Sequence, residues 1–223
     1  MESIRDSSLR NVKTMDGKMK GMIMAGMAGL CLILGIMAAL GNTWLVPEEE
    51  MEGMDGGTSL NSQWVELDTA DMGASSESEC DMMADMMAGD NGGEAECDGT
   101  VLTMTMPFSD ACDDGDDDSC DMATGGLIGT IGMWAGIVCA LMVTLTLVLP
   151  MAGVDAMDAV PEMGNKIATW GAGALMLVGM LGWYFMLPDG GEMSLGMSGW
   201  MAGAAWSTGL GSALIGQFIE ADE

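Results

Sequence analysis

The sequence predicts an integral membrane protein that is mainly α-helical. We expect a left-handed bundle of four transmembrane helices, with a small disulfide-bonded, β-containing extracytoplasmic domain between helices 1 and 2. Three observations predict this fold. Four apolar stretches of about 20 residues contain no Asp, Glu, Lys, Arg or His, the basic residues gather at the N-terminus, and an acidic segment with four cysteines follows the first apolar stretch.

The apolar stretches give the four helices. A hydrocarbon core of ~30 Å needs about 20 helical residues, and each stretch meets that length. Helices of a soluble bundle would need more polar chain to cover them than these 223 residues contain. A cleaved signal peptide would have a shorter apolar run and a shorter basic region than the first stretch has. We therefore expect uncleaved transmembrane helices at 21–43, 125–150, 166–187 and 195–219.

Charge asymmetry predicts the orientation. Five of the six basic residues lie in the first twenty positions, and the positive-inside rule places that segment, 1–20, in the cytoplasm. Lys166 beside the third helix places the loop 151–165 on the same side. Because the number of helices is even, the C-terminal residues 220–223 return to the cytoplasm. We therefore expect a multi-pass protein of the plasma membrane whose extracytoplasmic parts are 44–124 and 188–194.

Aromatic side chains near the helix ends agree with these boundaries, since amphipathic rings prefer the membrane interface. The residues concerned are Trp44, Trp170, Trp183, Tyr184 and Trp200. Trp134 and Trp206 lie deeper and are expected to pack between helices. Small residues at four-residue spacing indicate close helix contacts, within one chain or between copies: Ala25/Gly29, Gly125/Gly129, Gly132/Gly136, Gly199/Gly203 and Ser212/Gly216.

The outer segment is acidic and contains two predicted strands. It holds 23 of the 34 acidic residues and no Lys or Arg between Pro47 and Thr124. Residues 58–69 and 99–109 are expected strands, the second because Leu102, Met104 and Met106 alternate with Val101, Thr103 and Thr105. Residues 71–99, rich in Gly, Ser and acids, are expected to be mostly mobile, with one or two helical turns near 78–87.

Four outer cysteines, Cys80, Cys97, Cys112 and Cys120, lie where thiols can oxidise. Four cysteines allow three connectivities, and the sequence does not choose among them. We favour the pairing of neighbours, Cys80 with Cys97 and Cys112 with Cys120. Cys31 and Cys139 fall within helices and are expected to be small apolar packing residues.

The stretch "DACDDGDDDSCD", residues 110–121, is the candidate metal site. It partly matches an EF-hand loop but has Cys112 at the third position and follows a strand, so we expect no true EF-hand. A looser calcium site remains a hypothesis, because a divalent cation relieves repulsion between neighbouring carboxylates. The alternative is a solvated acidic coat, typical of a marine or halophilic microbe, since ~1 M salt screens charge beyond about 3 Å. The candidate ligands are Asp110, Asp113, Asp114, Asp116, Asp118 and Asp121.

Methionines in "SECDMMADMM" raise a second metal hypothesis. Met82/Met86 and Met83/Met87 recur at i,i+4, and thioethers suit Cu(I). However, the outer segment has 10 Met in 78 residues and the whole chain 28 in 223, so the local enrichment is nil. We favour packing or low complexity over copper delivery.

Several kinds of chemistry have no support in the sequence. There is no histidine, no CxxC motif and no phosphate-binding loop, so we expect no enzymatic activity and no cofactor other than a candidate Ca2+. The helices lack the ionisable residues that ion-coupled transport ordinarily uses. The negative outer field excludes nucleic acid as a partner. The expected partners are the lipid bilayer and either further copies of the chain or another membrane protein.

The arrangement resembles the claudin and peripheral myelin protein superfamily. "GNTWLV" places Trp44 just after the first helix, and Trp64 in "NSQWVEL" falls near the family's second loop tryptophan. "NKIATWGAGALMLVGMLGWYF" and "LGMSGWMAGAAWSTGLGSALIG" are similar in texture to its third and fourth helices. The chain departs from the family signature because no Cys closely follows Trp64.

The resemblance implies a non-enzymatic membrane protein whose outer sheet meets neighbours, lipids or partner subunits. We therefore expect a role in membrane organisation, in adhesion, or as a scaffold or partner subunit. The alternative is an accessory that binds Ca2+ or Cu outside the membrane, or one associated with transport.

Overall fold

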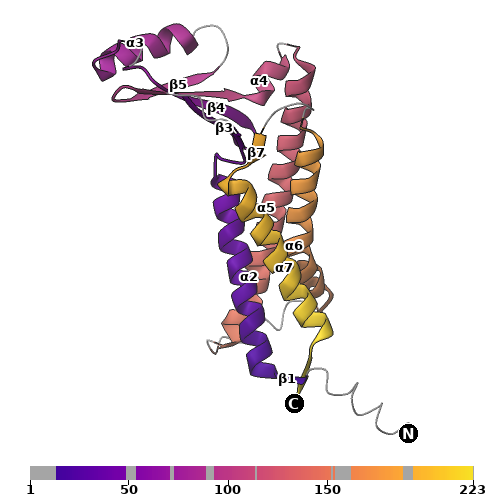
Figure 1. Ribbon diagram of the computed structural model, residues 1–223. Helices are drawn as coiled ribbons and strands as arrows, with labels where there is room; N and C mark the ends of the chain where they lie inside the picture. Colours follow the sequence, from indigo (N-terminus) through magenta and orange to yellow (C-terminus); the bar gives the residue numbers. More distant parts are fainter. Residues whose placement is uncertain are drawn as a thin grey trace. The chain divides into compact units, whose positions relative to one another are not determined.

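Figure 1 shows the computed structural model of the chain, which is mostly helical. The structure describes residues 14–48, 54–70, 73–88, 93–113, 115–151, 153, 162–187 and 193–222. The chain divides into two compact units. We call Met1–Ile36, Trp134–Leu177 and Gly203–Glu223 the helical unit, and Met37–Met133 with Val178–Ala202 the sheet unit.

Four long helices contribute residues to both units: α2 (Gly17–Leu40), α5 (Asp117–Met151), α6 (Glu162–Phe185) and α7 (Met197–Phe218). Within the described residues, α2, α5 and α6 are long and apolar enough to cross a membrane. Helix α7 matches the fourth predicted apolar stretch but is not among these three. Its 22 residues include five glycines and three serines, which lower its mean hydropathy.

The exposed surface of the three apolar helices is typical of membrane-spanning helices. Only 22%, 28% and 33% of their most apolar windows are buried. Large apolar side chains such as Ile33, Ile131 and Val178 are more than half exposed. Soluble proteins rarely present contiguous apolar surface of this extent. The three helices and the two disulfides therefore indicate a membrane protein with an oxidised, extracytoplasmic part.

Small side chains bring the helices of the helical unit together. Ala28, Val143 and Ala168 form one buried cluster between α2, α5 and α6. A Cβ placed on Gly209 would lie 2.8 Å from the Cα of Gly173, so glycine at both positions lets α7 and α6 meet backbone to backbone. Gly29, which we expected to support such packing, faces open space with no neighbour within 4 Å.

A second contact in the helical unit joins the two ends of the chain. Strand β1 (Thr14–Asp16) pairs in parallel with β8 (Glu220–Asp222). The Lys20 ammonium donates hydrogen bonds to the carbonyls of Gly216 (3.0 Å) and Ile219 (2.6 Å). The Gly216 carbonyl lies in the last turn of α7 and the Ile219 carbonyl directly follows the helix. An ammonium there satisfies acceptors that have no intrahelical partner and opposes the helix dipole.

The sheet unit contains a six-stranded antiparallel sheet in the order β5-β6-β4-β3-β2-β7. The predicted strands are confirmed as β4 and β6, which are neighbours in the sheet. Strand β7 lies after α6, at the end of the short segment 188–194 that was predicted to be extracytoplasmic. It pairs with β2, which follows α2. The strand bounds are β2 (Leu45–Pro47), β3 (Met54–Thr58), β4 (Ser62–Asp68), β5 (Glu94–Asp98), β6 (Val101–Pro107) and β7 (Met193–Leu195).

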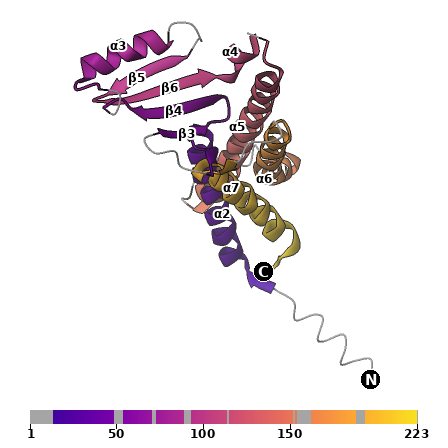
Figure 2. The same cartoon turned by 45° about the horizontal axis from the view of Figure 1, so that its top comes forward.

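Helix α3 (Glu77–Ala88) covers one face of this sheet beside β5 and β6 (Figure 2). Leu102 is fully buried there with Cys80 and Ala84. The Cys80–Cys97 disulfide links α3 to β5. Our expectation that residues 71–99 are mostly mobile is wrong for 77–88 and 94–98, because the disulfide and the Leu102 core hold these segments in place.

The start of α3 is fixed by a local cap. The backbone N–H (2.7 Å) and the hydroxyl (2.8 Å) of Ser75 both donate to one carboxylate oxygen of Glu79. These two bonds, of which the backbone bond has the larger effect, hold the pKa of the Glu79 carboxyl below its ordinary value of 4.5. The arrangement is a variant of the capping box, and it fixes the start of the helix at Glu77.

Two tryptophans predicted at the membrane interface are buried instead. Trp44 is 0% and Trp183 2% exposed, and their rings meet edge to face with centroids 5.1 Å apart. The Trp44 indole N–H donates to the carbonyl of Ala38 (2.9 Å), which removes the need for water. Trp134, predicted to pack, is 44% exposed. Trp170, Tyr184 and Trp200 are exposed, as expected of interfacial rings.

Candidate interaction surface

The acidic stretch predicted as one loop is largely helical. Residues Phe108–Asp113 form the short helix α4, and α5 already begins at Asp117, eight residues before the predicted start of the second membrane helix. The Cys112–Cys120 disulfide joins the two helices, so the favoured pairing of neighbouring cysteines is found at both bonds. Gly115 makes the turn between the helices with φ of 92°, a conformation that favours glycine.

Five of the six candidate metal ligands lie among the described residues. Asp113, Asp116, Asp118 and Asp121 are exposed, Asp110 is half-buried, and Asp114 lies outside the described residues. Among the described residues, no three His, Cys, Asp or Glu side chains are placed to hold a metal ion. Asp110 and Asp116 accept hydrogen bonds from Ser109 and Ser119. The calcium site and the solvated acidic coat therefore both remain predictions for this stretch, whose described carboxylates are mostly exposed.

Two methionines of α3, Met82 and Met86, lie on its exposed surface. Met82 is 60% and Met86 78% exposed, so of the two expectations, packing or low complexity, packing is wrong for this pair. The i,i+4 spacing does put them on one face of the helix, and that face points away from the Leu102 core. Copper binding remains a prediction.

Acidic side chains that are separated in the sequence lie together on the sheet face opposite α3. Strand register places Glu96, Thr103, Glu66 and Asp55 in one row across β5, β6, β4 and β3. Two further rows run across β5, β6 and β4 on the same face. One consists of Asp98, Val101 and Asp68, and the other of Glu94, Thr105 and Trp64. We call this set the acidic face: Asp55, Glu66, Asp68, Glu94, Glu96 and Asp98, with Thr103 and Thr105 between them.

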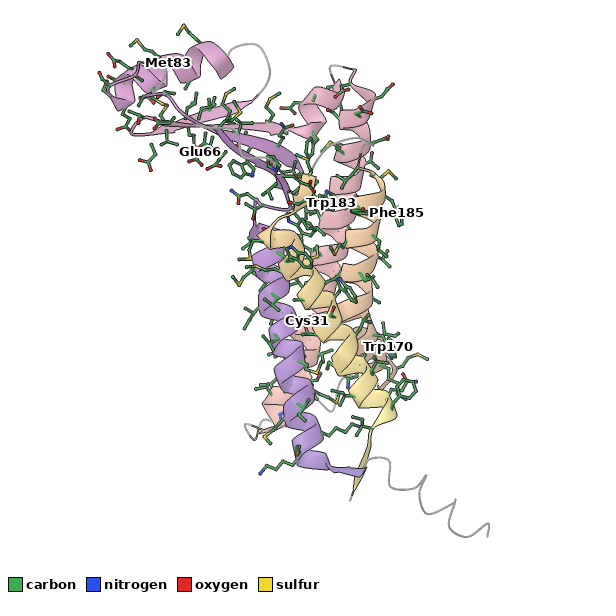
Figure 3. All side chains as sticks on the ribbon, viewed as in Figure 1. Cys31, Glu66, Met83, Trp170, Trp183 and Phe185 are labelled. Carbon is green, nitrogen blue, oxygen red and sulfur yellow. A yellow bond between two sulfur atoms is a disulfide. The ribbon has the colours of Figure 1, made fainter. Side chains whose placement is uncertain are left out.

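The acidic face is unfavourable in isolation. Asp55 and Glu66 lie directly opposite each other on neighbouring strands, and like charges in that position destabilise a sheet. Glu94, Glu96 and Asp98 are exposed on the edge strand β5. Charges on an edge strand also discourage uncontrolled pairing with other strands. Figure 3 shows Glu66 on the side of the sheet opposite Met83 of α3.

Trp64 borders the acidic face and closes it toward β3. Its indole N–H donates to the carbonyl of Asn42 (2.7 Å). Its cross-strand partner is Gly57, where a Cβ would lie 3.1 Å from the indole nitrogen, so glycine leaves room for the ring. A cavity of about 450 Å3 lies next to Trp64, where β2 and β3 separate after the Leu45–Thr58 pair. Its walls include Pro47, Met54 and Met193.

The sequence signal for the acidic face was present but incomplete. The alternation Glu-Ala-Glu-Cys-Asp in β5 is the period-two pattern of a half-buried strand. It was obscured by the glycines and acids around it. No local signal sets Asp55 beside Glu66, because register depends on pairing between strands.

No protein-family model matches the chain, and no curated protein matches it.

Proposed function

We propose that the chain is a non-enzymatic membrane protein with four membrane-spanning helices, similar to the claudin and peripheral myelin protein superfamily. In this proposal it acts in membrane organisation, in adhesion, or as a scaffold or partner subunit through its acidic outer domain. The observation that carries the proposal is the acidic face, a row of carboxylates and threonines on a sheet stabilised by a disulfide.

Two strand pairings support α7 as a fourth crossing. The β2–β7 pair joins the segment after α2 to the segment before α7, and the β1–β8 pair joins the segment before α2 to the segment after α7. Helices α2 and α7 thus run between the same two ends in opposite directions. These pairings favour α7 as a further crossing if α2 spans the bilayer, despite the lower hydropathy of α7. Both termini then lie on one side, and the basic residues near α2 favour the cytoplasm.

The chemistry of the acidic face favours a basic partner surface. The carboxylates of Glu66 and Glu96 offer hydrogen-bond acceptors, and Thr103 between them offers a donor and an acceptor. Exposed single-sign charge steers an oppositely charged partner and sets the orientation of docking. The repulsion between Asp55 and Glu66 would be relieved by such a partner, which adds to the binding free energy.

Site-specific photo-crosslinking in native membranes tests the proposal. A photoreactive residue at Thr103, in the centre of the acidic face, is expected to crosslink to a protein neighbour or to a second copy. The E66Q/E96Q variant should abolish this crosslink because it removes the two charges that flank Thr103. The matched control D81N/D85N removes two exposed charges from α3 and should leave the crosslink intact.

The same preparation distinguishes the alternatives. A crosslink that persists in E66Q/E96Q, or one lost equally in D81N/D85N, would show that the acidic face does not select the partner. A rise in thermal stability with millimolar Ca2+ would instead favour the role of a cation-binding accessory.

A further inference from the structure

The cavity next to Trp64 is a candidate site for a small ligand. All the residues that line it belong to the sheet unit, and its volume of about 450 Å3 lies in the range of small-molecule sites. Most of its side chains are apolar, and the Trp64 indole and the Asp55 side chain complete the part that matters for recognition. The apolar lining residues are Val46, Pro47, Met54, Val65 and Met193.

The Trp64 ring is held in one position by two contacts. Its N–H donates to the carbonyl of Asn42 (2.7 Å), and the ring packs against the backbone of Gly57. An indole has no other polar atom, so the rest of the ring offers a ligand only C–H groups and π-electrons. Among aromatic side chains, tryptophan attracts cations most strongly.

Asp55 supplies a negative charge next to this ring. The register pairs Trp64 with Gly57 and Glu66 with Asp55, so Trp64 and Asp55 are diagonal neighbours on the acidic face. Diagonal neighbours on paired strands lie about 7–8 Å apart, which leaves space for a small cation between the ring and the carboxylate. Glu66, directly opposite Asp55, adds a second carboxylate to the same face.

No basic side chain of the sheet unit is available to neutralise these carboxylates. The segments 37–133 and 178–202, which form this unit, contain most of the acidic residues of the chain and no Lys, Arg or His. Residues of the unit that lie outside the described ranges therefore add acidic groups but no cation. The charge of the unit thus favours a positively charged ligand in the cavity.

The walls favour an organic cation over a metal ion. Among the residues that the structure describes, no three His, Cys, Asp or Glu side chains are placed to hold a metal ion. A metal ion or a primary ammonium would also have to exchange its water shell for walls that are mostly apolar. A methylated ammonium holds water weakly, and its methyl groups pack well on an indole and on the polarisable sulfurs of Met54 and Met193.

We propose that this cavity binds a small soluble quaternary ammonium compound, with its trimethylammonium group between Trp64 and Asp55. The indole ring attracts the cation, the Asp55 carboxylate supplies the opposite charge, and the apolar walls contact the methyl groups. The proposal concerns a small ligand in a cavity rather than a protein partner on the acidic face. It depends on Trp64 and Asp55, whereas the crosslinking experiment depends on Glu66 and Glu96, so the two proposals fail separately.

Calorimetric titration of the full-length protein in a maltoside detergent tests the proposal, with choline as the probe and a sodium phosphate buffer free of organic cations. We expect choline to bind about tenfold more tightly than its neutral isostere, in which a quaternary carbon replaces the nitrogen. Equal binding of these two compounds would overturn the proposal. Ethanolamine, which lacks the methyl groups, should bind about fivefold more weakly than choline. Equal or tighter binding of ethanolamine would overturn the assignment and favour the ammonium group of a basic protein partner.

Substitutions locate the binding site. D55N should keep the fold, because it also relieves the repulsion with Glu66, and should weaken choline binding about threefold. W64L should weaken it about fivefold, and W64F, which keeps an aromatic ring, should weaken it less. The matched control is D98N, which removes one charge from β5, separated from β3 by β6 and β4. An equal loss in D55N and D98N, or an unchanged affinity in correctly folded W64L, would refute the proposed site.

A last arm separates a soluble compound from a lipid headgroup. Phosphocholine presents the same trimethylammonium group next to a phosphate, which the carboxylates of the acidic face repel. We expect phosphocholine to bind about fivefold more weakly than choline. Binding as tight as that of choline would overturn the assignment to a soluble cation and favour the headgroup of a membrane lipid.

Discussion

Removal of the Cys80–Cys97 disulfide is expected to destabilise the sheet unit more than removal of Cys112–Cys120. The two bonds span 17 and 8 residues. The loop-closure relation gives about 3 kcal/mol for the longer loop and about 2.5 kcal/mol for the shorter one. C80A/C97A also removes a sulfur that is fully buried against Leu102 and Ala84, so the total loss should exceed the entropic part.

Hydrogen–deuterium exchange of the full chain in detergent measures this loss. About 3 kcal/mol corresponds to an increase of roughly a hundredfold in the exchange rate of β5 and β6 amides that exchange by opening of the sheet. Peptide mapping without reduction first confirms the connectivity. The control C31A removes a buried cysteine that closes no loop and should leave β5 and β6 unchanged. A loss below about 1 kcal/mol, or a larger loss in C112A/C120A, would refute the reasoning.

Three further predictions follow from the helices and the acidic residues. Gly209→Val forces a side chain into the α6 backbone and should lower the free energy of unfolding by about 1–3 kcal/mol, measured by thermal unfolding. Gly26→Ala has open space at its Cβ and should be neutral or stabilising. Equal effects of the two substitutions would contradict the helix contact. Because the folded pKa of Glu79 lies below its ordinary value of 4.5, its contribution to α3 is present at neutral pH and lost as pH falls below that value. E79Q should therefore reduce the pH dependence of the protection of the α3 amides against exchange. An unchanged dependence of this protection on pH would count against the cap. The exposed acids around the Cys112–Cys120 disulfide that the structure describes are Asp113, Asp116, Asp117 and Asp118. If these acids are only a solvated coat, replacing them with Asn should leave the circular dichroism spectrum and the midpoint of unfolding unchanged. A midpoint in the wild type that rises with Ca2+ would contradict that reading.

The sequence predicted those parts of the fold that depend on local pattern. Uncharged apolar length predicts α2, α5 and α6, and alternation predicts β4 and β6, because both signals are contained in short windows. Neighbour pairing of the cysteines was also found, since each pair is close in sequence.

The parts that were missed depend on contacts between distant residues. Strand β7 has three residues and no pattern of its own, and it becomes a strand because β2 offers an unpaired edge. Trp44 has the position of an interfacial ring, yet Trp183 and the carbonyl of Ala38 provide both an apolar and a polar partner in the interior. The acidic face follows from the register of four strands, which no local window contains.

The β2–β7 pair also sets an order of events during biosynthesis. Strands β3 to β6 are all encoded before α5, so they can pair as soon as that part of the chain has emerged. The outer edge of β2 must wait until α6 has been made and β7 follows. The nascent protein therefore exposes unpaired backbone groups on β2 throughout the insertion of two long helices, and this is the stage at which chaperones or misassembly would compete for that edge.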